Sequence, residues 1–166
     1  MTSISITNGV NLVYNKKIFE SAVVSLLTLI IAFCCNATEA AGDISKVRID
    51  YGVSEIYTQE DMDSAIEIIK EKFSRWDGCE LHSIRYTDDD YCNIEKNIKW
   101  MNDLAEGQGY EPNFTQCIAF FSSFHSPKSD EDNKTTFNTD SEYEDWSWYL
   151  ARTDGGEWKL MTFGYN

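Results

Sequence analysis

Apolar residues occupy every second position of residues 47–53, with polar residues or glycine between them. This alternation, with β-branched residues, is typical of a strand that has one face in water. Residues 79–86 predict a second short strand, in which the apolar positions change phase between Leu81 and Ile84. Either both faces of this strand are covered or a bulge interrupts it.

Two other stretches carry apolar residues at spacings of three and four, the pattern of a helix with one apolar face. The first begins at Thr58, which can cap the helix amides while Asp61 reaches back as in a capping box, and it runs to about Arg75. The second ends before Gly107. The apolar positions are Met62, Ala65, Ile66, Ile69 and Phe73 in the first helix and Tyr91, Ile94, Ile98, Met101 and Ala105 in the second.

The second half of the chain predicts three further strands, at residues 114–124, 143–152 and 157–165. The turn Asp154-Gly155-Gly156 can supply the positive φ that a tight hairpin between the last two strands needs. The element order is therefore β-α-β-α-β-β-β. Because the helices come early and the antiparallel strands late, we expect one α+β domain at residues 42–166, with two helices packed on one face of a curved, mainly antiparallel sheet of four or five strands.

A polar and acidic loop at residues 125–141 separates the first two of these late strands. At about 17 residues it is longer than most connections within a domain, so it is either mobile or functional.

The first 41 residues have the pattern of a secretory leader. Lys16 and Lys17 precede an apolar run at residues 21–35, and small residues follow it. The run is shorter than a bilayer core requires, so we expect a cleaved signal peptide rather than an uncleaved anchor. Lipidation of Cys34 or Cys35 is a third alternative. All three predict an exported domain, which is either secreted or tethered to the outer face of the membrane by its leader alone.

The composition of the chain limits the partners that it can bind. The 166 residues include 14 Lys and Arg against 28 Asp and Glu, which gives a formal net charge of −14. Binding to nucleic-acid phosphates requires a basic face, as does adsorption to an anionic membrane leaflet, so both are disfavoured. The same charge favours solubility and repulsion between copies, and we expect a monomer.

Three cysteines follow the leader: Cys79, Cys92 and Cys117. Export permits a disulfide, so one bridge with one free thiol and three buried thiols both remain open. No C-x-x-C motif occurs, which argues against a zinc ribbon or a thioredoxin-like site. We expect no cofactor and no metal.

Four segments carry a resemblance: LHSIRY at residues 81–86, TQCIAF at 115–120, FHSP at 124–127 and WYLARTDGGEWKLMTFGY at 148–165. On these the chain resembles small exported or lipid-anchored proteins of Gram-positive bacteria, a group of unknown function. The resemblance spans about residues 47–165 and implies a cystatin-like or NTF2-like α+β fold. It brings no catalytic residues. The chain departs from the group between Pro127 and Tyr143, where a Gly-rich loop with Trp is replaced by an acidic one.

Aromatic residues crowd the last predicted hairpin. They are Trp146, Trp148, Tyr149, Trp158, Phe163 and Tyr165. These rings could form a flat platform that stacks on a sugar or a peptide side chain, or the core under the helices. The core interpretation is favoured, because each buried aromatic removes about 150–250 Å² from water and a few of them nearly complete a small core.

We expect a non-catalytic domain that binds a protein partner or a small ligand in the concavity between sheet and helices. The candidate ligand-binding residues are Arg85, His125, Trp148, Arg152 and Trp158. One alternative is a cell-surface hydrolase that uses carboxylates or His125. Cys117 with His125 can also be drawn as a nucleophile and its base, although the negative charge disfavours a thiolate. Another alternative is an acidic inhibitor that masks a basic partner.

Overall fold

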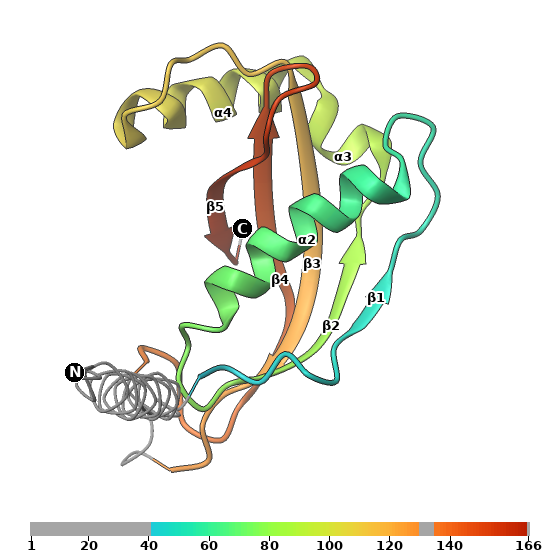
Figure 1. The fold of residues 1–166 in the computed structure, drawn as a ribbon. Coiled ribbons are helices and arrows are strands. Elements are labelled where there is room, and N and C mark those ends of the chain that lie inside the picture. Colours follow the sequence, from blue (N-terminus) through green and yellow to red (C-terminus); the bar gives the residue numbers. More distant parts are fainter. Residues whose placement is uncertain (1–40, 130–134, 166) are drawn as a thin grey trace, which may run out of the picture. The chain divides into compact units, whose positions relative to one another are not determined.

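The computed structural model of the protein describes residues 41–129 and 135–165. Figure 1 shows an open sheet with helices against it. The elements are β1 (Arg48–Asp50), α2 (Gln59–Phe73), β2 (Glu80–Tyr86), α3 (Asp89–Asn93), α4 (Glu95–Gln108), β3 (Gln116–His125), β4 (Glu142–Arg152) and β5 (Lys159–Gly164). Residues 1–40 of the predicted leader, with Cys34 and Cys35, lie outside the described residues, as does the centre of the acidic loop. No helix in the described part has the length and hydropathy needed to cross a membrane.

The five strands lie in the sheet in their chain order, from β1 to β5. β1 pairs parallel with β2, so α2 connects these two strands as a crossover. The remaining neighbours pair antiparallel. The predicted α+β class is therefore confirmed, with one parallel pair in a mainly antiparallel sheet.

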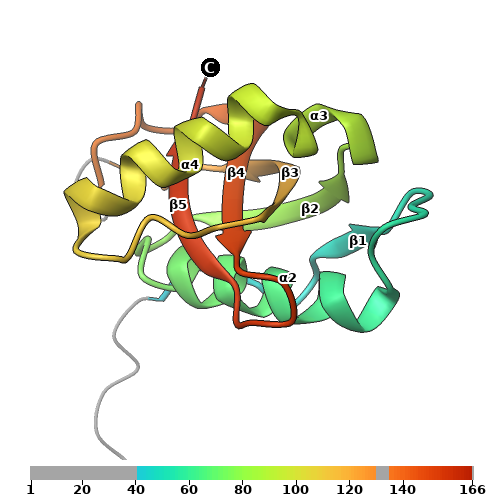
Figure 2. The same cartoon turned by 90° about the horizontal axis from the view of Figure 1, so that it is seen from above.

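The helices cover both faces of the sheet, so the prediction that they pack on one face is wrong. Figure 2 shows α2 on one side of the sheet and α3 with α4 on the other. Phe120 and Trp148 belong to the core under α2, whereas Cys117 and Ala119 belong to the core under α3 and α4. Neighbouring residues of β3 thus enter different cores, which is why residues 117–120 are all buried.

α2 begins and packs as the sequence predicts. The Thr58 side chain accepts a hydrogen bond from the Asp61 amide at 3.1 Å, and the Asp61 carboxylate accepts one from the Thr58 amide at 3.0 Å. This capping box satisfies backbone donors at the helix start. The predicted apolar positions are all buried: Met62, Ala65, Ile66, Ile69 and Phe73.

The second predicted helix is in fact two helices, α3 and α4. Asp88 caps α3 by accepting a hydrogen bond from the Tyr91 amide at 2.7 Å. The chain is extended at Ile94, with φ −68° and ψ 147°, and α4 starts at the next residue. Ile94 has the spacing of a buried position, yet its side chain is exposed, so periodicity alone did not reveal the break.

The early strands differ in detail from their predictions. β1 ends at Asp50, because the chain turns away at Gly52, where φ is +55°, and Val53 is exposed. The phase change in β2 is a bulge, since its register against β3 shifts between Leu81 and Ser83. The bulge therefore accounts for the change of phase in β2.

The last hairpin forms where it was predicted. Gly155 has φ +69° in the turn between β4 and β5, a conformation that glycine adopts without steric cost. Trp148 and Trp158 are buried in the core under α2, and Trp146 packs against that core. The core interpretation of these tryptophans is therefore confirmed.

Candidate functional site

Two of the predicted binding residues, Arg152 and Trp158, meet at a hollow between α2 and the β4–β5 hairpin. The hollow has a volume of about 510 Å³. Its other lining residues include Ser64 and Ile68 of α2 and Glu157 of the hairpin. The structure thus places one end of the last hairpin beside the middle of α2.

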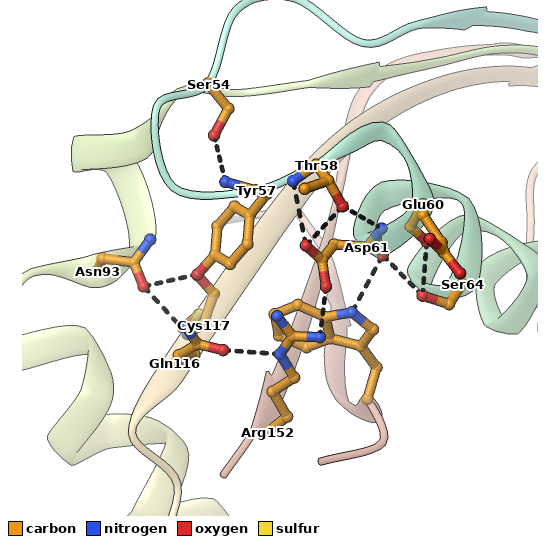
Figure 3. Close-up of polar contacts among 11 residues, drawn as sticks. Ser54, Tyr57, Thr58, Glu60, Asp61, Ser64, Asn93, Gln116, Cys117 and Arg152 are labelled. Carbon is orange, nitrogen blue, oxygen red and sulfur yellow. Dashed lines mark hydrogen bonds and ion pairs between the residues drawn. The ribbon is translucent and has the colours of Figure 1, made fainter. Parts of the chain in front are cut away.

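The Arg152 guanidinium is held on several sides. Its Nη1 lies 2.7 Å from Asp61 Oδ1, and its Nε donates a hydrogen bond to Gln116 Oε1 at 2.7 Å, as Figure 3 shows. Its Cζ lies 4.2 Å from the centre of the Trp158 ring, within cation–π range. Because the Arg152 side chain is only 12% exposed, its ion pair with Asp61 is partly desolvated and less screened than a surface pair.

Asp61 connects the helix cap to this hollow. Its carboxylate accepts a hydrogen bond from the Thr58 hydroxyl at 2.8 Å, and its backbone carbonyl accepts one from Trp158 Nε1 at 3.1 Å. Burial alone raises the pKa of Asp61, but the hydrogen bonds from Thr58 and Arg152 outweigh it and hold this pKa below its ordinary value. Asp61 is therefore ionised at neutral pH and ties α2 to the hairpin.

Tyr57 supports the Trp158 ring from the loop before α2. The two rings pack edge to face with their centres 5.6 Å apart. The Tyr57 hydroxyl lies 2.8 Å from both Asn93 Oδ1 and the Cys117 carbonyl oxygen. Burial raises the pKa of Tyr57, so its hydroxyl keeps its proton and can donate it. Asn93 thus connects α3 to Tyr57 and, through the Tyr57 ring, to Trp158.

Asp89 holds the loop that leads to Tyr57. Its carboxylate accepts hydrogen bonds from the Ser54 hydroxyl, from the Glu55 amide at 2.7 Å and from the Tyr86 hydroxyl at 2.8 Å. Burial alone raises the pKa of Asp89, but the hydrogen bonds from Ser54 and Glu55 outweigh it, so this pKa lies below its ordinary value. Hydrogen bonds to a charged acceptor are strong, and they fix this loop against α3.

A disulfide between Cys92 and Cys117 joins α3 to β3. Of the two arrangements that the sequence left open, one bridge with one free thiol is the one formed. Among the described cysteines Cys79 is the one with a free thiol, and burial raises its pKa to about 11. The nucleophile drawn at Cys117 beside His125 is therefore wrong, because Cys117 has no free thiol.

Two further hollows adjoin the first around β5. One, of about 470 Å³, shares Ile68 and Trp158 with the first hollow. The other hollow, of about 280 Å³, shares Tyr110 and Lys159 with the hollow of about 470 Å³. Because they share lining residues, the three hollows are neighbours around the start of β5, from α2 to Tyr110. We call these three hollows together the β5 groove.

Trp148 and Arg85 lie outside the β5 groove. Trp148 is fully buried in the core under α2, so it cannot meet a ligand without unfolding. Arg85 lies on β2, where it forms an ion pair with Asp145 at 2.7 Å. The predicted concavity that joins both residues to Arg152 and Trp158 is therefore not formed.

His125 also lies apart from the groove, at the end of β3. Its Nδ1 is 2.7 Å from the Ser126 carbonyl oxygen, and its Nε2 is 3.5 Å from Asp140. The other histidine of the chain, His82, lies 3.0 Å from Glu142. Within residues 41–129 and 135–165, no group of three His, Cys, Asp or Glu is placed to hold a metal ion.

Sequence reasoning missed the residues that position Arg152 and Trp158. Asp61 was recognised only as a helix cap, and Tyr57 was not singled out. Tyr57 did carry a signal, because an apolar residue just before an N-cap often packs against the fourth helical residue, here Met62. Both are buried in the same core. Gln116 and Asn93 carried no such signal, since their partners are far away in the sequence.

The site brings together an aromatic ring, a guanidinium held by Asp61 and Gln116, and a neighbouring hollow. Trp158 is 4% exposed and the Arg152 side chain 12%, so both lie in the wall of the hollow with most of their surface covered. No protein-family model, curated protein or solved structure matches this chain.

Proposed function

We propose that this chain is an exported, non-catalytic domain that binds a protein partner at the cell surface through the β5 groove. The observation that carries the proposal is that Arg152 and Trp158 are held in place in the wall of a hollow that has further hollows beside it at the start of β5. Side chains that are already in place lose less entropy on binding. A row of three neighbouring hollows suits an extended polypeptide better than a compact small molecule.

Two features support the exported part of the proposal. Residues 1–41 have the leader pattern, and the disulfide between α3 and β3 is of a kind that persists in oxidising compartments. The intact mass of the protein from the medium of its own cells is expected to start near Gly42. A diacylglyceryl group on Cys34 or Cys35 would instead tether the domain to the membrane, and an uncleaved chain in the cytoplasm would contradict export.

Site-specific photo-crosslinking in the producing cells tests the binding surface. A photoreactive side chain at Glu157, which is 89% exposed beside the groove, is expected to capture a partner. The matched control is Lys99, which is 73% exposed on α4 and does not line the groove, and it is expected to capture none. Equal capture at both positions, or none at either, contradicts the proposal.

A further inference from the structure

We propose that oxidation of Cys92 and Cys117 to a disulfide fixes the wall that Arg152 and Trp158 form in the β5 groove, so that the binding site is completed only after the chain leaves the reducing cytoplasm. We call these two residues the groove wall. This inference rests on the proposed function, because it names how the site of that function is regulated. Its support comes from the residues beside the two cysteines and from the small size of α3.

The first support of the groove wall lies beside Cys92, at the end of α3. The next residue, Asn93, accepts a hydrogen bond at its Oδ1 from the Cys117 amide at 3.2 Å, and this oxygen lies 2.8 Å from the Tyr57 hydroxyl (Figure 3). The same hydroxyl lies 2.8 Å from the Cys117 carbonyl oxygen. β2 does not extend to this part of β3, so Asn93 and Tyr57 satisfy the backbone groups that a neighbouring strand would otherwise pair.

The second support lies beside Cys117, on β3. The preceding residue, Gln116, accepts a hydrogen bond from Arg152 Nε at 2.7 Å. Arg152 Cζ in turn lies 4.2 Å from the centre of the Trp158 ring and 6.0 Å from the centre of the Tyr57 ring. The disulfide therefore joins the residues next to both supports by a covalent bond.

α3 is too short to keep its position by its own helical hydrogen bonds. It has five residues, whereas isolated helices shorter than about 12–15 residues are marginal in water. Asp89 holds its first residue against the preceding loop, and Cys92 is the residue of α3 that is buried. Without the disulfide, the end of α3 that carries Asn93 loses its covalent link to β3, and Tyr57 loses a fixed partner.

The oxidant that this step needs is a protein or small-molecule disulfide in the exported compartment. The thiolate of one cysteine attacks that disulfide, which gives a mixed disulfide and releases one thiol. The thiolate of the other cysteine displaces the remaining sulfur. The S–S bond forms, the two cysteines lose two protons and two electrons, and the oxidant becomes two thiols. Cys92 is then 1% exposed and Cys117 0%, so a reductant cannot reach the bridge and the site stays assembled.

Hydrogen exchange measured by NMR on the ¹⁵N-labelled full chain from its own cells tests the inference. The probes are the amide of residue 117 and the Trp158 indole N–H, which donates to the Asp61 carbonyl at 3.1 Å. In Cys92→Ala/Cys117→Ala, both probes are expected to exchange at least about tenfold faster than in the control, Leu81→Ala.

Leu81 is a matched control because it is buried against the other end of β3, with the disulfide left intact. Truncation of a core leucine lowers global stability by an amount comparable to the loss of a disulfide. Equal exchange rates in the two variants would show that the disulfide acts on the groove wall through global stability alone, and this result overturns the proposal.

A second pair of variants keeps the disulfide and decides the question if the cysteine variant does not fold. Asn93→Ala removes the residue that connects the disulfide to Tyr57, and it is expected to speed exchange of the Trp158 indole by at least about tenfold. Asn102→Ala is the matched control, because Asn102 of α4 also accepts a backbone hydrogen bond, from the Phe114 amide at 2.8 Å. Its effect on the Trp158 indole is expected to be less than about twofold. An equal effect of the two variants, or no effect of Asn93→Ala, contradicts the proposal.

Crosslinking from Glu157 separates this inference from the proposed function. If Glu157 captures nothing while the exchange rates respond as expected, the proposed function is wrong and the dependence of the groove wall on the disulfide stands. If Glu157 captures the same partner equally well in the wild type and in Cys92→Ala/Cys117→Ala, the redox dependence is wrong and the proposed function stands.

Discussion

The two faces of the sheet are stabilised by different means. Under α2 the core is built from large rings, among them Phe73, Phe120 and Trp148. Under α3 and α4 the strands contribute small residues such as Ala119 and Ala151, and a disulfide joins helix to strand. A buried aromatic ring removes about 150–250 Å² from water, far more than an alanine. The first face therefore depends on buried area, and the second depends in addition on a covalent bond.

The β5 groove needs both faces. Asp61 of α2 holds Arg152, and Asn93 of α3 holds Tyr57, which packs on Trp158. Loss of packing on either face would therefore loosen the same groove. Substitutions that act on one face at a time can separate the two contributions.

Replacing Trp148 with alanine is expected to have the largest effect. Trp148 is fully buried under α2, and Trp→Ala in a core costs about 3–5 kcal/mol of unfolding free energy. Trp100, which is partly buried on the opposite face, is the matched position, and its alanine variant is expected to lose about 2 kcal/mol. Urea denaturation measures both. An equal loss of unfolding free energy in the two variants would show that both faces depend on buried area to the same extent.

Removing the disulfide is expected to have the next largest effect. Cys92 and Cys117 are 25 residues apart, and a bridge over that separation contributes about 3 kcal/mol to the unfolding free energy. The Cys92→Ala/Cys117→Ala variant should lose this amount in urea denaturation, and the wild type should lose a similar amount in reductant. The unfolding free energy of the variant should not change when reductant is added.

Thiol alkylation checks the same pairing independently. In the folded protein Cys79 should resist alkylation at neutral pH, because it is buried and its pKa is raised to about 11. After unfolding without reductant, one of the three cysteines 79, 92 and 117 should react. Uptake of three groups would contradict the disulfide.

Asp61→Asn is expected to have an intermediate effect that depends on pH. The pKa of Asp61 is lowered in the folded protein, so its carboxylate adds stability above its unfolded pKa of about 3.9, and that stability is lost as pH falls through the folded pKa. The variant should lose about 2 kcal/mol at neutral pH and converge with the wild type in acid. Urea denaturation at a series of pH values measures this. Glu60→Gln, one residue earlier in α2, is the control, and its unfolding free energy should differ little from that of the wild type.

Asp145→Asn is expected to have the smallest effect. Asp145 and Arg85 lie 2.7 Å apart, the same distance as Asp61 and Arg152, but their side chains are 70% and 47% exposed. Surface pairs of this kind contribute less than about 1 kcal/mol. Asp145 has φ +53°, which asparagine tolerates, so the substitution tests the charge alone. A loss as large as that of Asp61→Asn in denaturation would contradict the role given to burial.

The coverage of both sheet faces could have been read from the sequence. Residues 117–120 of β3 are an unbroken apolar run, and residues 148–151 of β4 are another. Such runs are typical of strands that are buried on both faces. The alternate positions that pack under α2 account for only one of the two buried faces. The break at Ile94 was harder to see, because this residue keeps the helical spacing while the backbone turns.

The sequence by itself determined the features that depend on neighbouring residues. The capping box of Thr58 and Asp61 sets the start of α2, and Gly155 sets the last turn. Their partners lie within a few residues, so a local pattern suffices.

Only the tertiary structure decided which distant groups meet. It paired Cys92 with Cys117 and not with Cys79, and it brought Trp158 to the Asp61 carbonyl across 97 residues of sequence. It also placed α2 on one face of the sheet and α4 on the other. An apolar stripe shows which side of an element is buried, but the choice of the surface that buries it depends on the packing of the whole chain.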